Sequence, residues 1–340
     1  MNLKELAKAL ELSQTTVSRA LNGYPEVSAE TRQRVEEMAR KLGYAPNQQA
    51  RRLATGRSMS IGHVIPRSLH EMMNPVFMEF IAGAGETYSR HGYDMIISVV
   101  EDPNVEDAYR EIARRKKADA VMVHGPRMGD TRPALLRELG LPFLLHGRVP
   151  GEEETTSWID VNNGRAFERA TNLLLDLGHQ RIALLNGLED MDFAARRRAG
   201  FEKAHTDRGM TICPDLMRAA DMTEPYGAES TRELLSSGNP PSAFLVSSMI
   251  TAIGVARAIG ECGLKIGTDI SVITHDDALS FLPNSGEVPI FTCTRSSVRH
   301  AGTRAAELLI EKILPHPDVL INEHLEAELI VGQSTGPAPA

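Results

Sequence analysis

Apolar side chains recur at helical spacing three times within the first 45 residues. In the first stretch they occupy Leu3, Leu6, Ala7 and Leu10, and in the third Val35, Met38, Ala39 and Leu42. Asn2, with Glu5 three residues later, is typical of a capped helix start, and the third stretch begins at Ser28 and ends at Gly43. The pattern predicts short amphipathic helices that share one small core.

The second stretch combines an apolar face with a polar one. Ser13 can cap a helix whose inward-facing residues are Val17, Ala20 and Leu21. The outward-facing residues are Gln14, Thr15, Ser18 and Arg19. Two helices joined by a tight turn, with a third as support, form a helix-turn-helix, whose second helix enters the major groove of DNA. We therefore expect an all-α DNA-binding domain at 1–45, the alternative being a solvated polar helix face.

Residues 46–58 predict a marginal helix. Pro46 and Gly56 bracket a stretch in which Leu53 is the one large apolar residue. A helix this short is not stable alone in water, so it should order only when it docks, and DNA is the expected docking surface. A flexible linker with an incidental leucine is the alternative.

From Ser60 onward, short apolar runs alternate with helical stretches. The predicted strands are SIGHVI, DMIISVV, ADAVMV, PFLLH, RIALL, SAFLV and SVIT, and the helices between them include 77–91, 165–177 and 249–262. These three helices are followed by Gly92, Gly178 and Gly263, as expected of C-terminal caps. About ten apolar strands in two runs, joined by helices, predict an α/β body of two doubly wound parallel-sheet lobes. Ligands of such folds bind beyond the carboxyl ends of the strands, which favours a site between the lobes.

The distribution of charge also separates the first 58 residues from the rest of the chain. Residues 1–58 carry 10 Lys and Arg against 6 Asp and Glu, net +4, whereas the remaining 282 residues carry 27 against 39, net −12. The whole-chain charge of −8 conceals this basic segment. The asymmetry indicates localised phosphate contacts and argues against general coating of nucleic acid.

Length and composition exclude several classes of protein. At 340 residues, of which 42% are hydrophobic, the chain exceeds a usual single domain. No apolar run approaches the roughly 20 residues of a membrane span, and no hydrophobic signal core is present, which predicts a cytoplasmic protein without a membrane partner. Cys213, Cys262 and Cys293 are widely spaced and lack a Cys-x-x-Cys pattern, which favours reduced thiols over metal ligands or disulfides.

Enzyme signatures are missing from the predicted body. The sequence has no GxGxxG after a strand, no GxxxxGK[ST], no GxSxG and no HExxH. GAGETY at Gly83 has only the first two glycines of a phosphate loop and lies inside a predicted helix, where small residues serve helix packing. We expect no catalytic residues, no cofactor and no metal.

The segment LKELAKALELSQTTVSRALNGYPEVSAETRQRVEEMARKLGYAPN resembles the head of the lac repressor/gal repressor family of bacterial transcription regulators. The resemblance implies base contacts from Gln14, Thr15 and Arg19. Arginine pairs with guanine and glutamine with adenine. It implies phosphate contacts from Ser13, Ser18 and Asn22. By the same resemblance, the hinge helices of two subunits meet in the minor groove, where Leu53 and its mate are wedged into a base step and kink the duplex.

The likeness continues through the body, which in this family is similar to periplasmic sugar-binding proteins whose chain crosses between lobes three times. We expect these crossings near Asp160, at 281–289 and at 317–321. The body would span 59–335, with a first lobe at about 59–160 plus 290–318 and a second at about 161–285 plus 320–335. The final GPAPA, 336–340, should be a frayed tail.

The resemblance also implies an effector site between the lobes. Arg197, in FAARRRAGF, matches the arginine that grips sugar hydroxyls or a purine carboxylate. Asp276, in VITHDDA, matches an aspartate that accepts from ligand hydroxyls. A buried sugar requires both donors and acceptors, which this pair supplies. The alternatives are a solvated helix face for Arg197 and a strand-end turn for Asp276.

Further effector contacts rest on weaker signals. Phe77 and Phe193 offer apolar platforms for a sugar face, with core packing as the alternative. His124 ends a strand where the family lines its pocket, although a hydrogen-bonded turn histidine is equally consistent. Arg295 matches a polar cleft residue on the last crossing. Packing is the default explanation for Trp158, the only tryptophan.

The sequence departs from the family pattern at two strand ends. Gly147 replaces the acidic residue of an LIDR-like motif, so that Arg148 is expected to line the pocket, and Ser248 with Met249 replaces an Asn-Asp pair. The lost acceptors argue against a small monosaccharide. LHGR together with EDPNVEDAYREI resembles regulators of α-glucoside use, which implies a disaccharide effector.

Taken with the residues, the resemblance implies a dimeric repressor that binds a near-palindromic operator in double-stranded DNA and is released by a small carbohydrate. A purine-type corepressor system, in which the ligand tightens DNA binding, is the alternative. No heptad-like tail is visible, which favours a dimer and leaves a tetramer open.

Overall fold

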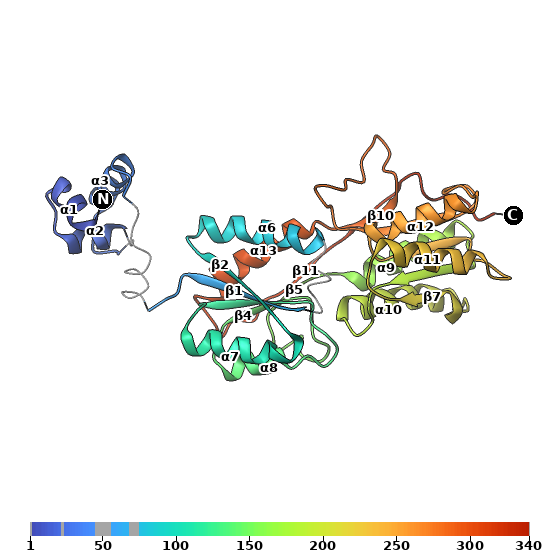
Figure 1. The fold of residues 1–340 in the computed structure, drawn as a ribbon, viewed down its shortest axis with the longest axis horizontal. Helices are drawn as coiled ribbons and strands as arrows, with labels where there is room; N and C mark the ends of the chain where they lie inside the picture. Colours follow the sequence, from blue (N-terminus) through green and yellow to red (C-terminus); the bar gives the residue numbers. More distant parts are fainter. Residues whose placement is uncertain (1, 22–23, 45–55, 68–74, 340) are drawn as a thin grey trace. The chain divides into compact units, whose positions relative to one another are not determined.

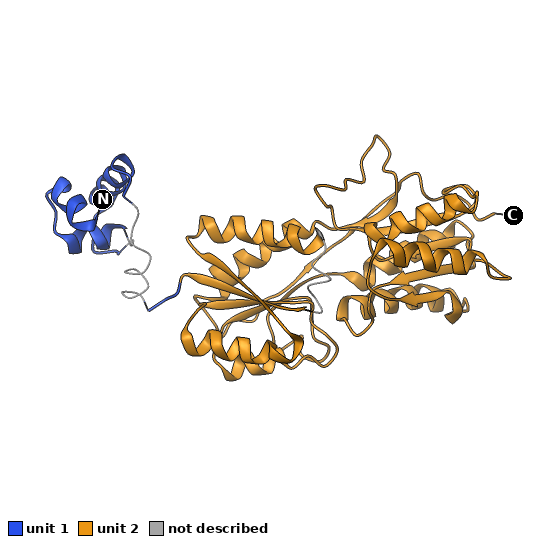
Figure 2. Ribbon diagram, in the orientation of Figure 1, with its two compact units in different colours: residues 1–58 blue, residues 59–340 orange. Residues whose placement is uncertain are grey.

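The computed structural model describes residues 2–21, 24–44, 56–67 and 75–339, which fall into two compact units, Met1–Ser58 and Met59–Ala340 (Figure 2). Most of the predicted hinge, including Leu53, and Asn22 lie outside the described residues. No helix in the described ranges is long and apolar enough to cross a membrane.

The described residues of the first unit form three short helices, α1 (Leu3–Leu10), α2 (Gln14–Leu21) and α3 (Ala29–Lys41). The predicted caps are confirmed: Asn2 Oδ1 accepts from Glu5 N at 3.0 Å, the Glu5 carboxylate accepts from Asn2 N, and Ser28 Oγ accepts from Thr31 N at 3.2 Å. One apolar core joins the helices, and its buried members are Leu6, Ala7, Leu10, Val17, Ala20, Val27, Val35 and Ala39.

The second unit contains two six-stranded sheets. The first has the order β11-β5-β4-β3-β1-β2, formed by Asn322–Leu325, Trp158–Val161, Phe143–His146, Ala120–His124, Ser60–Pro66 and Asp94–Val100. The second has the order β12-β10-β9-β8-β6-β7, formed by Glu328–Ile330, Thr292–Arg295, Ser271–Asp276, Ala243–Val246, Ile182–Asn186 and Met217–Ala219. Only the β10–β12 pair is antiparallel among the strand pairs of the described residues, so the parallel α/β prediction is confirmed.

Helices cover both faces of each sheet (Figure 1). In the first lobe, α6 (Pro75–Arg90) and α13 (Val298–Leu308), extended by η3 (Leu309–Ile313), cover one face, and α7 (Val105–Arg115) and α8 (Arg132–Glu138) cover the other. In the second lobe, α9 (Asn163–Asp176) and α10 (Asp192–Asp207) oppose α11 (Glu224–Leu235) and α12 (Met249–Glu261). The remaining short helices are η1 (Asp102–Asn104) and η2 (Pro214–Leu216).

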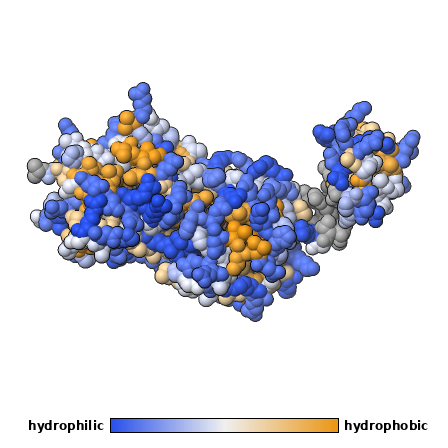
Figure 3. Space-filling view, turned by 180° about the vertical axis from the view of Figure 1, so that it is seen from behind, coloured by the Kyte–Doolittle hydropathy of each residue, from blue (hydrophilic) through white to orange (hydrophobic). Residues whose placement is uncertain are grey.

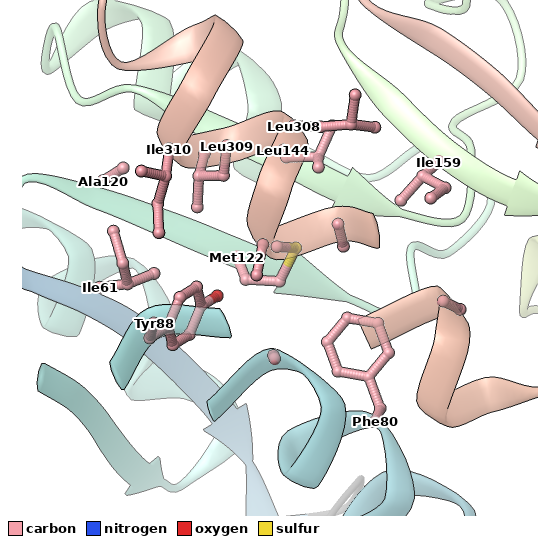
Figure 4. Close-up of a cluster of buried hydrophobic side chains, with 14 of the residues drawn as sticks. Ile61, Phe80, Tyr88, Ala120, Met122, Leu144, Ile159, Leu308, Leu309 and Ile310 are labelled. Atoms are coloured by element: carbon pink, nitrogen blue, oxygen red, sulfur yellow. The ribbon is translucent and has the colours of Figure 1, made fainter. Parts of the chain in front are cut away.

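Alternating side chains divide each sheet between two cores. Met122 joins Phe80 and Tyr88 of α6 in the cluster drawn in Figure 4, whereas its neighbours Val121 and Val123 pack against α7 and α8. Successive residues of a strand point to opposite faces, so a continuous apolar run is what a doubly covered sheet requires.

The chain passes between the lobes three times, after β5, after β10 and after β11. The structure therefore differs from the prediction at the second and third crossings. Residues 281–289 form a loop that leads back into the second sheet, where β10 pairs with β9, and 317–321 precede β11, which pairs with β5 in the first sheet. The family resemblance implied three crossings, but the local sequence carries no information on which sheet the next strand joins.

The predicted frayed tail is also wrong for its described residues. Gly336 O accepts from Ser271 Oγ at 3.1 Å, and Ala338 N donates to Leu177 O at 2.8 Å. His179 lies within hydrogen-bonding distance of Ser271 Oγ and Gly336 O, so the tail is part of the second lobe.

Glycines permit close contact between α6 and α13. A Cβ added at Gly83 would lie 2.0 Å from Arg299 O, and one added at Gly302 would lie 2.1 Å from Phe80 O. Backbone atoms cannot yield at such distances, so a side chain would force the helices apart. This confirms the helix-packing interpretation of GAGETY.

We predict that Gly302→Ala lowers the free energy of unfolding by about 1 to 3 kcal/mol, because overpacking displaces two backbones. Gly260→Ala is the matched control, because an added Cβ there meets nothing within 4 Å. That control should stabilise α12 by about 0.5 to 1 kcal/mol. Urea unfolding followed by circular dichroism measures both, and equal effects would contradict the packing argument.

Candidate functional site

The first unit presents a polar face on α2. Gln14, Thr15 and Arg19 are exposed, while Val17 and Ala20 of the same helix are buried. No hydrogen bond or ion pair to the described part of the chain engages these three polar side chains, which leaves their donors and acceptors available. Ser13 is exposed as well and Ser18 is half-buried.

Ser13 also caps α2. Its Oγ accepts from Thr16 N at 3.0 Å, so the hydroxyl fixes the start of the helix and faces solvent at the same time. Helix N-termini and hydroxyls are common partners of phosphate groups. The polar face and its cap therefore form a candidate nucleic-acid interface.

The second unit encloses a pocket of about 210 Å³ between its lobes. First-lobe strand ends contribute Ile65, His124, His146 and Asp160, and the second lobe contributes His275 at the end of β9. The remaining lining residues are Val76, Phe77, Phe80, Gly125, Pro126, Gly147, Val161, Asn163, Met191, Phe193, Arg197, Met222, Ser247, Asp277, Ser296, Val298 and Ala301. The pocket lies beyond the carboxyl ends of parallel strands, where such folds bind ligands.

Arg197 is the buried cation of the pocket. Its Nε donates to Asn163 Oδ1 at 2.8 Å and its Nη1 donates to Ser247 O at 2.7 Å. The guanidinium carbon lies 5.0 Å from the ring centre of Phe193, which also lines the pocket. Burial lowers the pKa of Arg197 to about 10, so the group remains charged at neutral pH. Among the described residues, no partner engages Nη2, which is available to a ligand.

Asp277 supplies a carboxyl group to the same pocket. Its Oδ1 lies 3.6 Å from His275 Nε2. Burial raises the pKa of Asp277 to about 7, although the nearby Arg197 opposes this shift. The carboxyl group is therefore close to half-ionised at neutral pH, and a hydroxyl donor would favour its ionised form.

Several predicted effector residues lie just outside the lining. The Asp276 carboxylate accepts from Arg295 Nε at 2.9 Å and from Ala278 N at 2.8 Å, so Asp276 and Arg295 hold the loop after β9. Ser248 Oγ accepts from Ile250 N and caps α12. In all three cases a neighbouring residue, Asp277, Ser247 or Ser296, lines the pocket instead, because adjacent side chains at a strand end point in different directions.

Arg148 makes structural contacts instead of lining the pocket. Its Nε donates to Asp160 Oδ2 at 2.8 Å, and its guanidinium carbon lies 5.1 Å from the ring centre of Trp158. Burial nevertheless raises the pKa of Asp160 to about 6. Trp158 itself is buried and donates from Nε1 to Glu153 O, consistent with a packing role.

Three imidazoles of the first lobe lie together at the pocket, and two of them, His124 and His146, line it. His63 Nδ1 and His124 Nε2 are 2.8 Å apart, which requires one to donate to the other. His146 packs face to face with Phe80, with ring centres 4.3 Å apart. Burial lowers the pKa of His63 to about 3 and of His146 to about 4, and it lowers that of His124 as well, so all three are neutral at physiological pH.

Two loops join the lobes across the mouth of the pocket. Met128 N donates to Asp190 O at 2.9 Å and Asp192 N donates to Pro126 O at 3.2 Å, with an antiparallel bridge between Arg127 and Met191. We call these paired segments, 126–128 and 190–192, the clasp. Pro126 and Met191 line the pocket, so the clasp borders the site.

Of the predicted effector residues, Phe77, His124, Phe193 and Arg197 lie together in the pocket, whereas Arg148, Ser248, Asp276 and Arg295 do not line it. Four lining residues were not predicted from the sequence, and each ends a strand or begins the segment after one: His146, Asn163, Ser247 and Asp277. Position at a carboxyl strand end was the signal available for them. No group of His, Cys, Asp and Glu within the described ranges is arranged to hold a metal ion.

Two family models match the chain. The model described as bacterial regulatory proteins, lacI family, matches residues 2–47. The model described as a periplasmic binding protein-like domain matches residues 171–335.

Curated relatives extend this likeness to the full length. The HTH-type transcriptional regulator AglR of Rhizobium meliloti (strain 1021) is 46% identical over 340 residues, which is 100% of this chain and 95% of AglR. The HTH-type transcriptional regulator RafR of Escherichia coli is 34% identical over 81% of this chain and 82% of RafR.

Solved structures are similar to the chain over the length of both units. The lac repressor dimer bound to operator and the anti-inducer ONPF has a TM-score of 0.77 and 26% identity, covering 99% of each chain. The complex of the transcriptional regulator CelR with cellobiose has a TM-score of 0.72 and 26% identity, covering 98% of this chain and 99% of that chain.

Proposed function

The chain belongs to the lacI family of bacterial transcription regulators, and from this membership we propose that it is a homodimeric repressor released from its operator by a neutral carbohydrate. The observation that carries the effector part is the inter-lobe pocket, in which Arg197 and Asp277 supply a donor and an acceptor beside aromatic and apolar side chains.

The proposed operator contacts come from α2. Gln14, Thr15 and Arg19 present amide, hydroxyl and guanidinium groups that suit base edges, and Ser13 and Ser18 suit phosphates. The net charge of +4 in residues 1–58 against −12 in the rest supports phosphate contact by this segment alone. The minor-groove role of Leu53 and the phosphate role of Asn22 remain proposals from the sequence.

The pocket chemistry favours an uncharged, hydroxyl-rich ligand. Arg197, the arginine among its described lining residues, already donates to Asn163 and Ser247 and faces the carboxyl groups of Asp160 and Asp277. A phosphorylated sugar would need further cations to offset the cost of burying its charge. Phe77 and Phe193 offer apolar surfaces for a sugar ring.

The proposed effector is a disaccharide, in line with the α-glucoside resemblance of the sequence. The similar regulator CelR is solved with cellobiose, which is also a disaccharide. Cellobiose and maltose differ only in the configuration of the bond between two glucose units, so comparing them tests the expected α linkage. A purine-type corepressor would instead tighten operator binding.

Dimerisation is supported by exposed apolar side chains. Ile97 and Val99 are 43% and 48% exposed on β2, which is an edge strand, and Phe281 is 57% exposed in the loop after β9. Hydrophobic residues also gather in two places on the face of the second unit in Figure 3. Such surface usually marks an interface. The similar lac repressor is solved as a dimer on its operator.

The proposed mechanism couples the pocket to the DNA-binding units through lobe closure. A ligand that contacts both lobes stabilises the closed state in which the clasp forms, and the lobe angle then sets the spacing of the two hinges in a dimer. Hinges that no longer meet lose their minor-groove contact. Coupling is reciprocal, so operator DNA weakens effector binding by the same factor.

Fluorescence anisotropy tests the proposed function directly. The full-length protein is titrated onto labelled DNA from upstream of its own gene, at fixed salt, with maltose, sucrose, trehalose, cellobiose, glucose, galactose or guanine. Release by one sugar is the expected result. Tightening by guanine, or no response to any sugar, would contradict the carbohydrate proposal.

We predict that Arg19→Ala weakens operator binding by about 5- to 100-fold, because a base-reading arginine contributes about 1 to 3 kcal/mol of discrimination. Binding to random DNA should fall much less. Arg40→Ala is the matched control, because it removes the same charge from an exposed position on α3. Equal loss on operator and random DNA would count against base reading by Arg19.

The pKa of Asp277, raised by burial to about 7, predicts pH-dependent effector binding. Hydroxyl donors favour the ionised carboxylate, so binding lowers its pKa and affinity rises with pH. If only the ionised form binds, affinity increases about tenfold from pH 6 to pH 8. Isothermal titration calorimetry with the releasing sugar should show this slope in the native protein. Asp277→Asn should lose most of this slope above pH 7, where Asp160, with a pKa of about 6, is already largely ionised, and an unchanged slope in this variant would reject the assignment.

The clasp can be weakened by removing a single N–H. Asp192 is the first residue of α10 and Met191 before it is extended, a setting that accepts proline. Asp192→Pro and the control Asp192→Ala both lose the carboxylate, but only proline removes the donor to Pro126 O. We expect effector dissociation to be about 2- to 10-fold faster in the proline variant than in the alanine variant. Recovery of operator binding after dilution of the sugar measures this rate, and identical rates would show that the clasp does not retain ligand.

A further inference from the structure

The end of β4 differs from the other strand ends at the pocket. The residue that follows this strand cannot place a polar side chain in the pocket. Gly147 has a φ of +110°, and a Cβ there would lie 2.7 Å from Pro126 Cδ. Both features exclude a side chain at 147. Arg148 is held by Asp160 at 2.8 Å and lies over Trp158. His146 is therefore the polar side chain that β4 gives to the pocket.

The ring of His146 is held in place by its neighbours. One face packs on Phe80, with ring centres 4.3 Å apart and planes inclined by 26°. His124, opposite His146 in the β3–β4 register, meets it edge to face at 6.0 Å and 84°. Because both neighbours are themselves buried or packed, the edge of the imidazole has a defined position before any ligand arrives.

The two ring nitrogens of His146, Nδ1 and Nε2, make no hydrogen bond with residues that the structure describes. By contrast, His63 and His124 share a hydrogen bond. Burial lowers the pKa of His146 to about 4, so the ring is neutral at physiological pH. A neutral imidazole has one N–H donor and one acceptor nitrogen, and a sugar hydroxyl has the same two capacities.

We propose that His146 determines effector specificity by hydrogen bonding one hydroxyl group of the sugar, on a ring that Phe80 holds in position. This assignment rests on the proposed carbohydrate effector and extends it. Arg197, Asn163 and Asp277 bind the ligand from the second lobe, and His146 binds it from the first. A ligand without the hydroxyl at this place leaves a desolvated imidazole unpaired, which makes the analogue bind weakly.

Calorimetry on the full-length protein tests the assignment with maltose and its monodeoxy analogues. His146→Phe keeps a flat ring on Phe80 and removes both nitrogens, whereas His146→Gln restores one donor and one acceptor. We expect the phenylalanine variant to bind maltose at least tenfold more weakly than the native protein. The native protein should discriminate against the monodeoxy analogue that lacks the hydroxyl bound by His146. The phenylalanine variant should bind that analogue as well as it binds maltose. The glutamine variant should recover part of the affinity and of the discrimination.

His205→Phe is the matched control. His205 is buried on α10, hydrogen bonds with Phe201 O and does not line the pocket, so its loss should leave maltose affinity and the ranking of the analogues unchanged. Circular dichroism verifies that each variant is folded.

Three outcomes would overturn the assignment. Native affinity in His146→Phe, or an equal loss for every analogue, would refute hydroxyl reading while leaving the carbohydrate effector intact. Failure of maltose and the other disaccharides to bind the native protein would refute the carbohydrate effector and this inference together.

Discussion

The burial of one guanidinium group between the two lobes is the constraint on which the body of this protein depends. Arg197 reaches from α10 to Asn163, the first residue after the first crossing, and to the backbone of Ser247 at the end of β8. Burying a cation is costly unless partners surround it, and here the partners come from separate elements. The same charge lowers the pKa of Asp277 against the effect of burial. The pocket therefore carries its recognition chemistry before a ligand binds, and a ligand completes a polar arrangement that the fold leaves partly unsatisfied.

The two walls of the pocket solve the problem of polar burial differently. The second-lobe wall places a buried arginine beside a carboxyl group and an amide, whereas the first-lobe wall packs neutral imidazoles against phenylalanine rings and adds the carboxyl group of Asp160. Under the proposed function, such a pocket favours ligands rich in hydroxyls over anions, and effector specificity depends on which hydroxyls the two walls satisfy together.

The sequence predicted the architecture well because apolar periodicity reports burial directly. The predicted strands of both lobes and the caps at Asn2 and Ser28 follow from local pattern alone, and the structure has them. The short strands β10, β11 and β12 were not among the predicted runs, and their assignment to a sheet depends on pairing between distant segments, which periodicity does not encode. The pocket was harder for a related reason. Asp276 and Asp277 are equivalent in a sequence pattern. In the turn after β9, however, Asp276 contacts Arg295, whereas Asp277 lines the pocket.

The clasp is made of peptide groups, and this has a consequence for how such a regulator can diverge. Hydrogen bonds from Met128 N and Asp192 N do not depend on which side chains those residues carry. Substitutions along both loops can therefore change the side chains beside the pocket while the backbone pairing of the clasp persists. Only residues that remove an N–H or distort the backbone are barred from these positions. The pairing of the lobes and the chemistry of recognition can therefore vary independently.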